Sequence, residues 1–132
     1  MIFKEGDSFQ HQFIVNENVY EGFLKLFNDR NPLHTNETFA LSKGFKGKVM
    51  HGNLLNGFLS YFIGERLPTK DVIIHSQTIE YKKPVYLDDV LSFEATVIGV
   101  YESINTVEFK FYFANKESVI ISKGKIQIGI LL

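Results

Sequence analysis

The segment NDRNPLH, from Asn28 to His34, places an acid and a histidine close together where a helical pattern ends. On a continuous α-helix five residues turn through about 500°, so the side chains of Asp29 and His34 would lie roughly 140° apart. Pro32 prevents that helix, because it lacks a backbone N–H and pushes Asn31 out of the α region. The bend can aim both side chains at one point, where they can hold a water molecule and move its protons.

The residue types in this segment leave a second interpretation open. Asp, Asn and Pro are also common at helix ends and in turns, so the same pattern is typical of a purely structural stop. In either case Asn31 is well placed to hold the bend by bonding nearby backbone groups.

A second candidate feature is VMHGN, from Val49 to Asn53, which leads into a strongly apolar segment. The start of a helix presents unpaired N–H groups and a partial positive charge. Gly52 leaves the backbone open to a substrate, so its amide can stabilise a carbonyl oxygen that becomes an oxyanion. The alternative is that Gly52 only relieves crowding at a buried helix start and that His51 fills space.

The remaining charged and imidazole groups carry weaker signals. Lys82 and Lys83 can meet the phosphates of a substrate carrier, although paired lysines more often form a solvated surface. His11 and His75 lie on expected strands without partners, and we interpret both as structural or exposed. Four histidines without clustered spacing do not predict a metal site.

The elements that must position these groups follow from apolar periodicity. A first strand is expected over 7–15, then a helix capped by Asn16 or by Asn18, which forms a capping-box pattern with Glu21. A long helix apolar on nearly every side follows over 54–67 and ends at Pro68. Alternating patterns then predict strands over 72–81, 91–97, 107–113 and 120–130.

This order predicts an α+β fold in which a curved antiparallel sheet wraps around the long buried helix. The four later strands, joined by short turns, are expected to form a meander. Gly57 and Gly64 each cost about 1 kcal/mol relative to Ala inside a helix, so we expect close packing against them.

Bulk properties narrow the class of protein. A chain of 132 residues suits one domain, which we expect to span 1–132. A net charge of −1 gives no electrostatic case for nucleic-acid binding, and the lack of Cys excludes disulfides, thiolate metal sites and a Cys nucleophile. The first residues lack the build of a signal peptide, and no apolar run is long enough to span a membrane. A cytoplasmic location is therefore the expectation.

Three stretches together resemble the MaoC-like hydratases and dehydratases, the R-specific enoyl-CoA hydratase family with the hot-dog fold. They are FNDRNPLHTN, FKGKVMHGNLLNGFLS and EYKKPVYLDDVLSF. The resemblance implies that Asp29 and His34 are catalytic, that Asn31 supports their loop, and that the Gly52 amide forms an oxyanion hole. His51 and Asn53 are then expected to support the site.

The resemblance also implies a reaction. Members act on acyl thioesters of coenzyme A or acyl carrier protein without a metal or redox cofactor, so we expect reversible hydration of a 2-enoyl thioester to the 3-hydroxyacyl thioester. The chain departs from the family pattern at Asn28, where Gly is usual, at Asn53, where an apolar residue is common, and at Asp88-Asp89, where Gly-Asp is usual. Asn53 suggests a substrate that is not a plain fatty chain.

Two other functions fit the same fold. A hot-dog thioesterase normally carries its acid on or near the central helix, where the only candidate is Glu65 at the far end. A non-catalytic acyl-binding or assembly module would not need Asp29 and His34 for its function. In each case an exposed sheet edge predicts a homodimer, and an acyl carrier protein is a possible partner.

Overall fold

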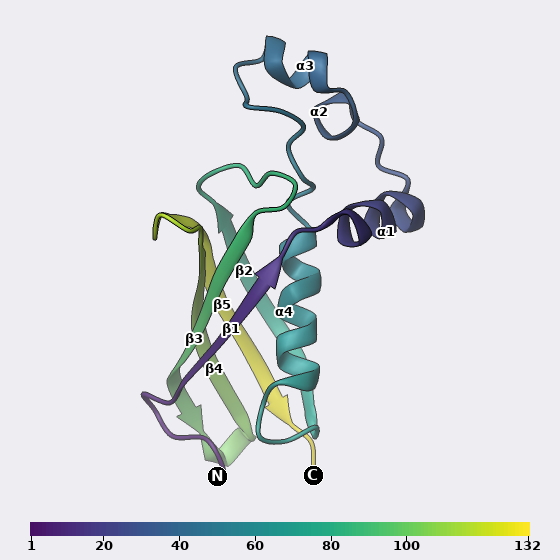
Figure 1. Ribbon diagram of the computed structural model, residues 1–132. Coiled ribbons are helices and arrows are strands. Elements are labelled where there is room, and N and C mark those ends of the chain that lie inside the picture. The colour runs from purple at the N-terminus through teal and green to yellow at the C-terminus, as the bar shows by residue number, and fades with distance from the viewer.

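A five-stranded antiparallel sheet forms the body of the protein, and helix α4 lies along one of its faces (Figure 1). The computed structural model describes residues 1–132. Its strands are β1 (Ser8–Ile14), β2 (Val72–Tyr81), β3 (Val90–Tyr101), β4 (Thr106–Ala114) and β5 (Ile120–Ile130). Its helices are α1 (Glu17–Phe27), α2 (Pro32–Thr35), α3 (Glu37–Ser42) and α4 (Leu54–Glu65), with a 3₁₀ turn η1 at Glu102–Ile104.

The strand order is β1-β3-β4-β5-β2, and every neighbouring pair is antiparallel. The predicted meander is confirmed for β3, β4 and β5. It is wrong for β2, which pairs with β5 and lies at the edge of the sheet. Alternation along a sequence identifies a strand but does not give its neighbours, and the connection from β2 to β3 carries the chain to the far side of the sheet.

The core lies between the sheet and α4 and contains 24 buried apolar side chains. The predicted alternation is confirmed in β4, where Phe109, Phe111 and Phe113 are buried while Lys110 is exposed. Phenylalanine rings from β3, β4 and α4 pack edge-on or tilted against one another, as at Phe62 and Phe93. The aromatic content of the sequence therefore builds the core.

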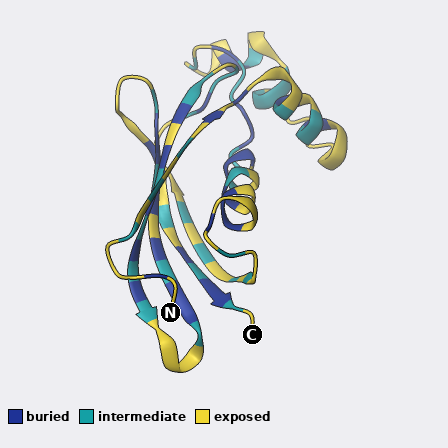
Figure 2. Ribbon diagram, turned by 60° about the horizontal axis from the view of Figure 1, so that its bottom comes forward, coloured by how far each residue is buried: buried dark blue, intermediate teal, exposed yellow.

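Helix α4 is covered by the sheet on one side and open on the other, which is less cover than its apolar sequence predicts. Leu55, Leu59 and Phe62 face the sheet and are buried, whereas Tyr61 on the outward side is 43% exposed. Figure 2 shows this division, with the exposed side of α4 turned away from the sheet. The expected close packing at Gly57 and Gly64 is absent from the chain itself, since nothing lies within 4 Å of a Cβ built at either position.

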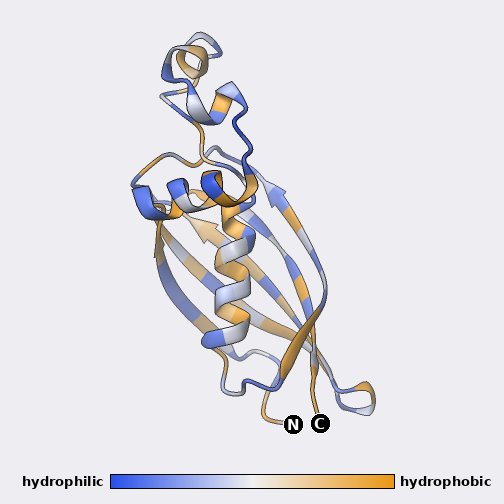
Figure 3. Cartoon of the chain, turned by 90° about the vertical axis from the view of Figure 1, so that its right-hand side faces the viewer, coloured by the Kyte–Doolittle hydropathy of each residue, from blue (hydrophilic) through white to orange (hydrophobic).

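The segment that carries the candidate residues stands beyond one end of the sheet. Helices α2 and α3 project past the sheet, and α1 crosses near the start of α4 (Figures 1 and 3). The cap of α1 is Asn16, whose side chain accepts from the N–H of Val19, so the proposed box of Asn18 and Glu21 is wrong. None of the helices has the length and apolar character needed to cross a lipid bilayer.

A carboxylate on the outer face of the sheet gives a pH-dependent contribution to stability. The hydroxyl groups of Tyr112 and Ser8 donate to Glu94 over 2.6 and 2.9 Å. These bonds, chiefly that of Tyr112, hold the pKa of Glu94 below its ordinary value of 4.5. The stabilisation is therefore present above pH 4.5 and is lost as the pH falls through the lowered pKa.

We expect Tyr112→Phe to lower the free energy of unfolding by about 1 kcal/mol near neutral pH. The difference from the wild type should shrink at an acidic pH below the lowered pKa, where Glu94 is protonated in both proteins. Urea unfolding at the two pH values measures it. An equal difference at both would show that the carboxylate form of Glu94 does not matter.

Candidate active site

The turn that carries the acid and the histidine is built by two asparagines, one before Asp29 and one before Pro32. Helix α1 ends at Phe27, and Asn28 follows with φ 55° and ψ 29°, a left-handed conformation that Asn adopts more readily than most residues. The side chain of Asn31 then accepts from the N–H of Leu33 over 2.9 Å and caps α2. The predicted break is confirmed, but Pro32 opens the next helix instead of simply ending the previous one.

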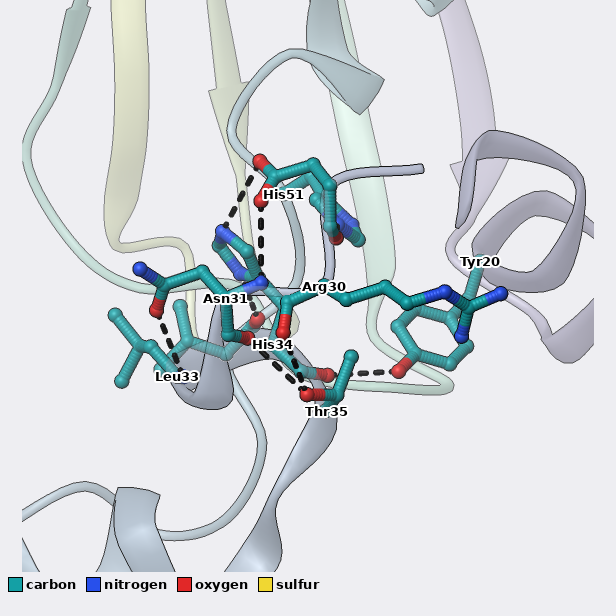
Figure 4. Close-up of polar contacts among 9 residues, drawn as sticks. Tyr20, Arg30, Asn31, Leu33, His34, Thr35 and His51 are labelled. Carbon is teal, nitrogen blue, oxygen red and sulfur yellow. Dashed lines mark hydrogen bonds and ion pairs between the residues drawn. The ribbon is translucent and has the colours of Figure 1, made fainter. Parts of the chain in front are cut away.

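His34 is held in one tautomer by the backbone. Its Nδ1 lies 2.7 Å from the carbonyl oxygen of Val49, and a carbonyl only accepts, so Nδ1 carries the hydrogen. Nε2 keeps its lone pair and lies 3.8 Å from Oδ2 of Asp29. This separation is too long for a direct hydrogen bond and leaves room for a bridging water. Figure 4 shows His34 within this cluster of polar contacts.

His51 contacts both residues of this pair. Its Nε2–H donates to the backbone carbonyl of Asp29 over 2.8 Å, and its ring stacks on that of His34 with centroids 4.0 Å apart. The side chain is buried, and its Nδ1 has no partner in the protein. His51 thus links the VMHGN segment to the acid–histidine bend, a role that space filling alone does not describe.

Tyr20 also belongs to this site, although no motif in the sequence marks it as a candidate. Its hydroxyl donates to the backbone carbonyl of His34 over 2.7 Å from a buried position. Burial raises the pKa of Tyr20, and the nearby charges of Glu21 and Glu17 add to this. The hydroxyl therefore stays protonated and fixes the backbone of His34.

The amide of Gly52 is free at the start of α4. Neither its N–H nor that of Asn53 forms a hydrogen bond within the protein, and the side chain of Asn53 does not cap the helix. A Cβ at position 52 would lie 3.0 Å from the ring of Tyr81, so glycine allows this close approach. A half-buried helix N-terminus with unpaired donors can bind a carbonyl oxygen.

A groove runs from this site between α1 and α4. It has a volume of about 810 Å³ and is lined by Asp29 together with apolar side chains and asparagines. Because Asn53 also lines it, the groove joins the bend to the start of α4. One residue of each sequence feature, Asp29 and Asn53, therefore lines the same groove.

The ring stack bears on whether a metal fits here. Ligand atoms of Asp29, His34 and His51 all lie within 4.8 Å of one another. The two rings are tilted by 30°, and one nitrogen of each is engaged with a backbone carbonyl, so each ring keeps one nitrogen for another partner. The spacing of the histidines in the sequence did not predict this grouping, which the fold creates.

The lysines and the other histidines lie elsewhere. Lys82 pairs with Glu80 over 2.7 Å, and Lys83 lines a separate groove that shares no residue with the one containing Asp29. His11 is half-buried between Phe13 and Tyr61, where burial and, less strongly, Arg66 lower its pKa. His75 is exposed on β2, so neither histidine has an acid–base partner, as expected.

We expect Asn31→Ala to lower the free energy of unfolding by about 1 kcal/mol, since it removes the cap of α2. Activity should fall as well, because the same turn holds His34 opposite Asp29. Thermal unfolding and steady-state rates measure the two effects. Asn31→Ser keeps a capping oxygen and should recover most of both; failure of Ser to do better than Ala would contradict the capping role.

Comparisons with known proteins identify the family of this chain. The family model described as MaoC like domain matches residues 5–116. An (R)-specific enoyl-CoA hydratase of Rhodospirillum rubrum is 35% identical over 107 residues, which are 81% of this chain and 74% of that protein. A mitochondrial 3-hydroxyacyl-[acyl-carrier-protein] dehydratase of Arabidopsis thaliana is 24% identical over 94% of this chain and 75% of its own length.

The fold is also found among solved structures. An (R)-hydratase from A. caviae aligns with a TM-score of 0.90 over 98% of both chains, at 23% sequence identity. At this identity the likeness concerns the fold alone, and it confirms the hot-dog architecture expected from the sequence.

Proposed function

This chain belongs to the MaoC-like dehydratase family, and from that premise we propose that Asp29 and His34 catalyse the reversible addition of water to a 2-enoyl thioester. The product is the 3-hydroxyacyl thioester. The observation that carries the proposal is the 3.8 Å distance between Nε2 of His34 and Oδ2 of Asp29. Both of these atoms accept hydrogen bonds. A water there donates to both and presents its oxygen lone pair to carbon 3 of the substrate.

Hydration takes one proton from water and delivers one proton to carbon 2. As the water oxygen bonds to carbon 3, its proton passes to Nε2 of His34 or to the carboxylate of Asp29. Carbon 2 then receives a proton from the residue that took it up. Alternatively, the other residue of the pair delivers it after the proton has passed between His34 and Asp29. The bond from Nδ1 to Val49 and the contact with His51 keep Nε2 aimed at this point.

The amide of Gly52 supports the second half of the reaction. Electron density moves onto the thioester oxygen as the enolate forms, and an N–H at that oxygen stabilises the enolate more than the ground state. The proposal uses no metal or redox cofactor. The substrate is carried on coenzyme A or on the phosphopantetheine of a carrier protein, and Lys83, which has no ion-pair partner, is a candidate contact for carrier phosphate.

Thioester hydrolysis receives less support from the geometry. The acid expected of a hot-dog thioesterase, Glu65, lies at the opposite end of α4 from Gly52 and pairs with Lys70 over 2.8 Å. The test is one assay with two readouts on short and medium enoyl thioesters of both carriers. Loss of enoyl absorbance without release of free thiol supports hydration, and thiol release would overturn it.

We expect His51 to act through position, and two variants separate its contacts. His51→Gln keeps an N–H for the carbonyl of Asp29, and His51→Phe keeps the ring face on His34. Both should lower kcat, and His51→Phe should lose more, about ten- to hundredfold, because the carbonyl of Asp29 loses its donor. Steady-state kinetics on the folded variants measure this. Full activity of His51→Phe would remove His51 from the mechanism.

The protein is expected to work as a homodimer. Strand β2 is an unpaired edge on which Ile73 is 51% exposed, and the outward face of α4 carries Gly57 and Gly64 with open space above them. A second copy can cover both features across a two-fold axis. Light scattering with activity measured on dilution tests this: a monomer with full activity would contradict it.

A further inference from the structure

We propose that the groove beside Asp29 selects acyl chains that carry a neutral oxygen, such as a hydroxyl, ether or keto oxygen, close to the reacting carbons. The inference rests on the proposed hydratase function and names the class of acyl group. The distinguishing residue is Asn53, which directly follows Gly52.

The groove is continuous with the water site because Asp29 lines both. Its walls come from α1 and from the first half of α4, and its volume of about 810 Å³ accommodates a short chain. Most of its side chains are apolar and suit the carbons of an acyl group. They are Val19, Phe23, Leu26, Phe27, Leu54 and Phe58.

A chain of amides fixes the polar part of the groove. Nε2 of Gln77 donates to Oδ1 of Asn56 over 2.7 Å, and Nδ2 of Asn56 donates to Oδ1 of Asn53 over 2.8 Å. Nδ2 of Asn56 also donates to the hydroxyl of Tyr81 over 3.2 Å, which uses its second hydrogen. This direction of donation leaves Nδ2 of Asn53 without an acceptor in the protein, so its amide group offers two free N–H donors at the groove.

These donors discriminate between acyl groups with and without an oxygen near them. A plain alkyl chain would cover the amide and leave its N–H groups without the hydrogen bonds that water gives them, which costs affinity. A substrate oxygen would accept from them instead. Sites built to hydrogen-bond a substrate oxygen reject analogues that lack it.

The charge of the groove excludes a carboxylate as the substrate group that accepts from Asn53. Asp29 is the only ionisable residue that lines it, and no Lys or Arg is available to pair with an acid. A second carboxylate beside Asp29 would be repelled.

Because consecutive Cα atoms are about 3.8 Å apart, Asn53 acts close to the carbonyl bound at Gly52. We therefore place the oxygen on carbon 4 or carbon 5 of the chain.

Two matched substrate pairs test the proposal. The hydroxyl of 5-hydroxy-2-pentenoyl-CoA replaces a methyl group of 2-hexenoyl-CoA, and 4-hydroxy-2-pentenoyl-CoA is matched in the same way with 4-methyl-2-pentenoyl-CoA. The quantity measured is the ratio of kcat/KM for the hydroxylated and the alkyl member. We expect a ratio of about ten in at least one pair for the wild type, and a fall to about one in Asn53→Leu.

Two further variants sharpen the result. Asn56→Leu removes the donor that orients Asn53 and should lower the ratio in part. Asn18→Leu is the matched control, since Asn18 lines the groove but forms no side-chain hydrogen bond, and it should keep the wild-type ratio.

Each outcome bears on the proposal. It is overturned if the wild type shows no preference, if Asn53→Leu keeps the preference, or if Asn18→Leu removes it instead. An equal loss for both members in Asn53→Leu would also overturn it, because Asn53 would then act on the part that the substrates share. Hydration of 2-hexenoyl-CoA without a preference would leave the hydratase function intact, whereas failure to hydrate any enoyl thioester would refute that function itself.

Discussion

Replacing Asp29 by Asn is expected to lower kcat for hydration by about 10²–10⁴-fold, the range for loss of a general acid–base group. The amide has the shape of the carboxylate and keeps an oxygen for the N–H of Asn31, which Asp29 now accepts over 3.3 Å. It cannot accept a proton from water, so the chemistry is lost while the loop persists. Binding of the acyl thioester should change little.

Enoyl absorbance gives the rate, and thermal unfolding shows that the fold is kept. Asp88→Asn is the matched control: Asp88 has φ 68°, which Asn tolerates, and it lies outside the groove of Asp29. Its rate should stay within about twofold of the wild type, as is usual for surface substitutions. Near-normal hydration by Asp29→Asn would show that the carboxylate does not take part. A binding module would retain its function in this variant.

His34→Asn is expected to cause a loss of similar size for a different reason. The Asn side chain can still donate to the carbonyl of Val49, as Nδ1 does now, but it has no atom in the place of Nε2. The water then loses one of its two acceptors. His34→Ala removes both contacts and should be at least as inactive, with some added loss of stability because the carbonyl of Val49 loses its donor.

The double variant of Asp29→Asn and His34→Asn gives a sharper test. If the two residues hold one water, the double variant should be only slightly slower than the slower single variant, since groups that act as a unit are strongly non-additive. Multiplicative losses would show that the residues act at separate steps. Asp88→Asn again serves as the control and should leave the rate within about twofold of the wild type.

Local sequence patterns were sufficient to predict the structural features that have a local physical cause. Alternation of apolar residues identified the later strands, because side chains of a strand alternate between core and solvent. The kink between Asp29 and His34 also follows from local chemistry, since Asn28 accepts left-handed geometry at the end of α1 and Pro32 begins a new helix. Both candidate features of the site could thus be found from residue types and spacing.

Other properties depend on contacts between segments distant in the sequence, and these were decided only by the tertiary structure. The pairing of β2 with β5 and the open outer face of α4 belong to this group. So do the hydroxyl of Tyr20 on the backbone of His34, and His51 between His34 and Asp29. No spacing rule predicts them, because a hydrogen bond or ring stack depends on where the backbone brings two groups together. The sequence by itself determined which groups are available for acid–base chemistry, and the fold determined that Asp29, His34 and His51 lie together at one end of a groove.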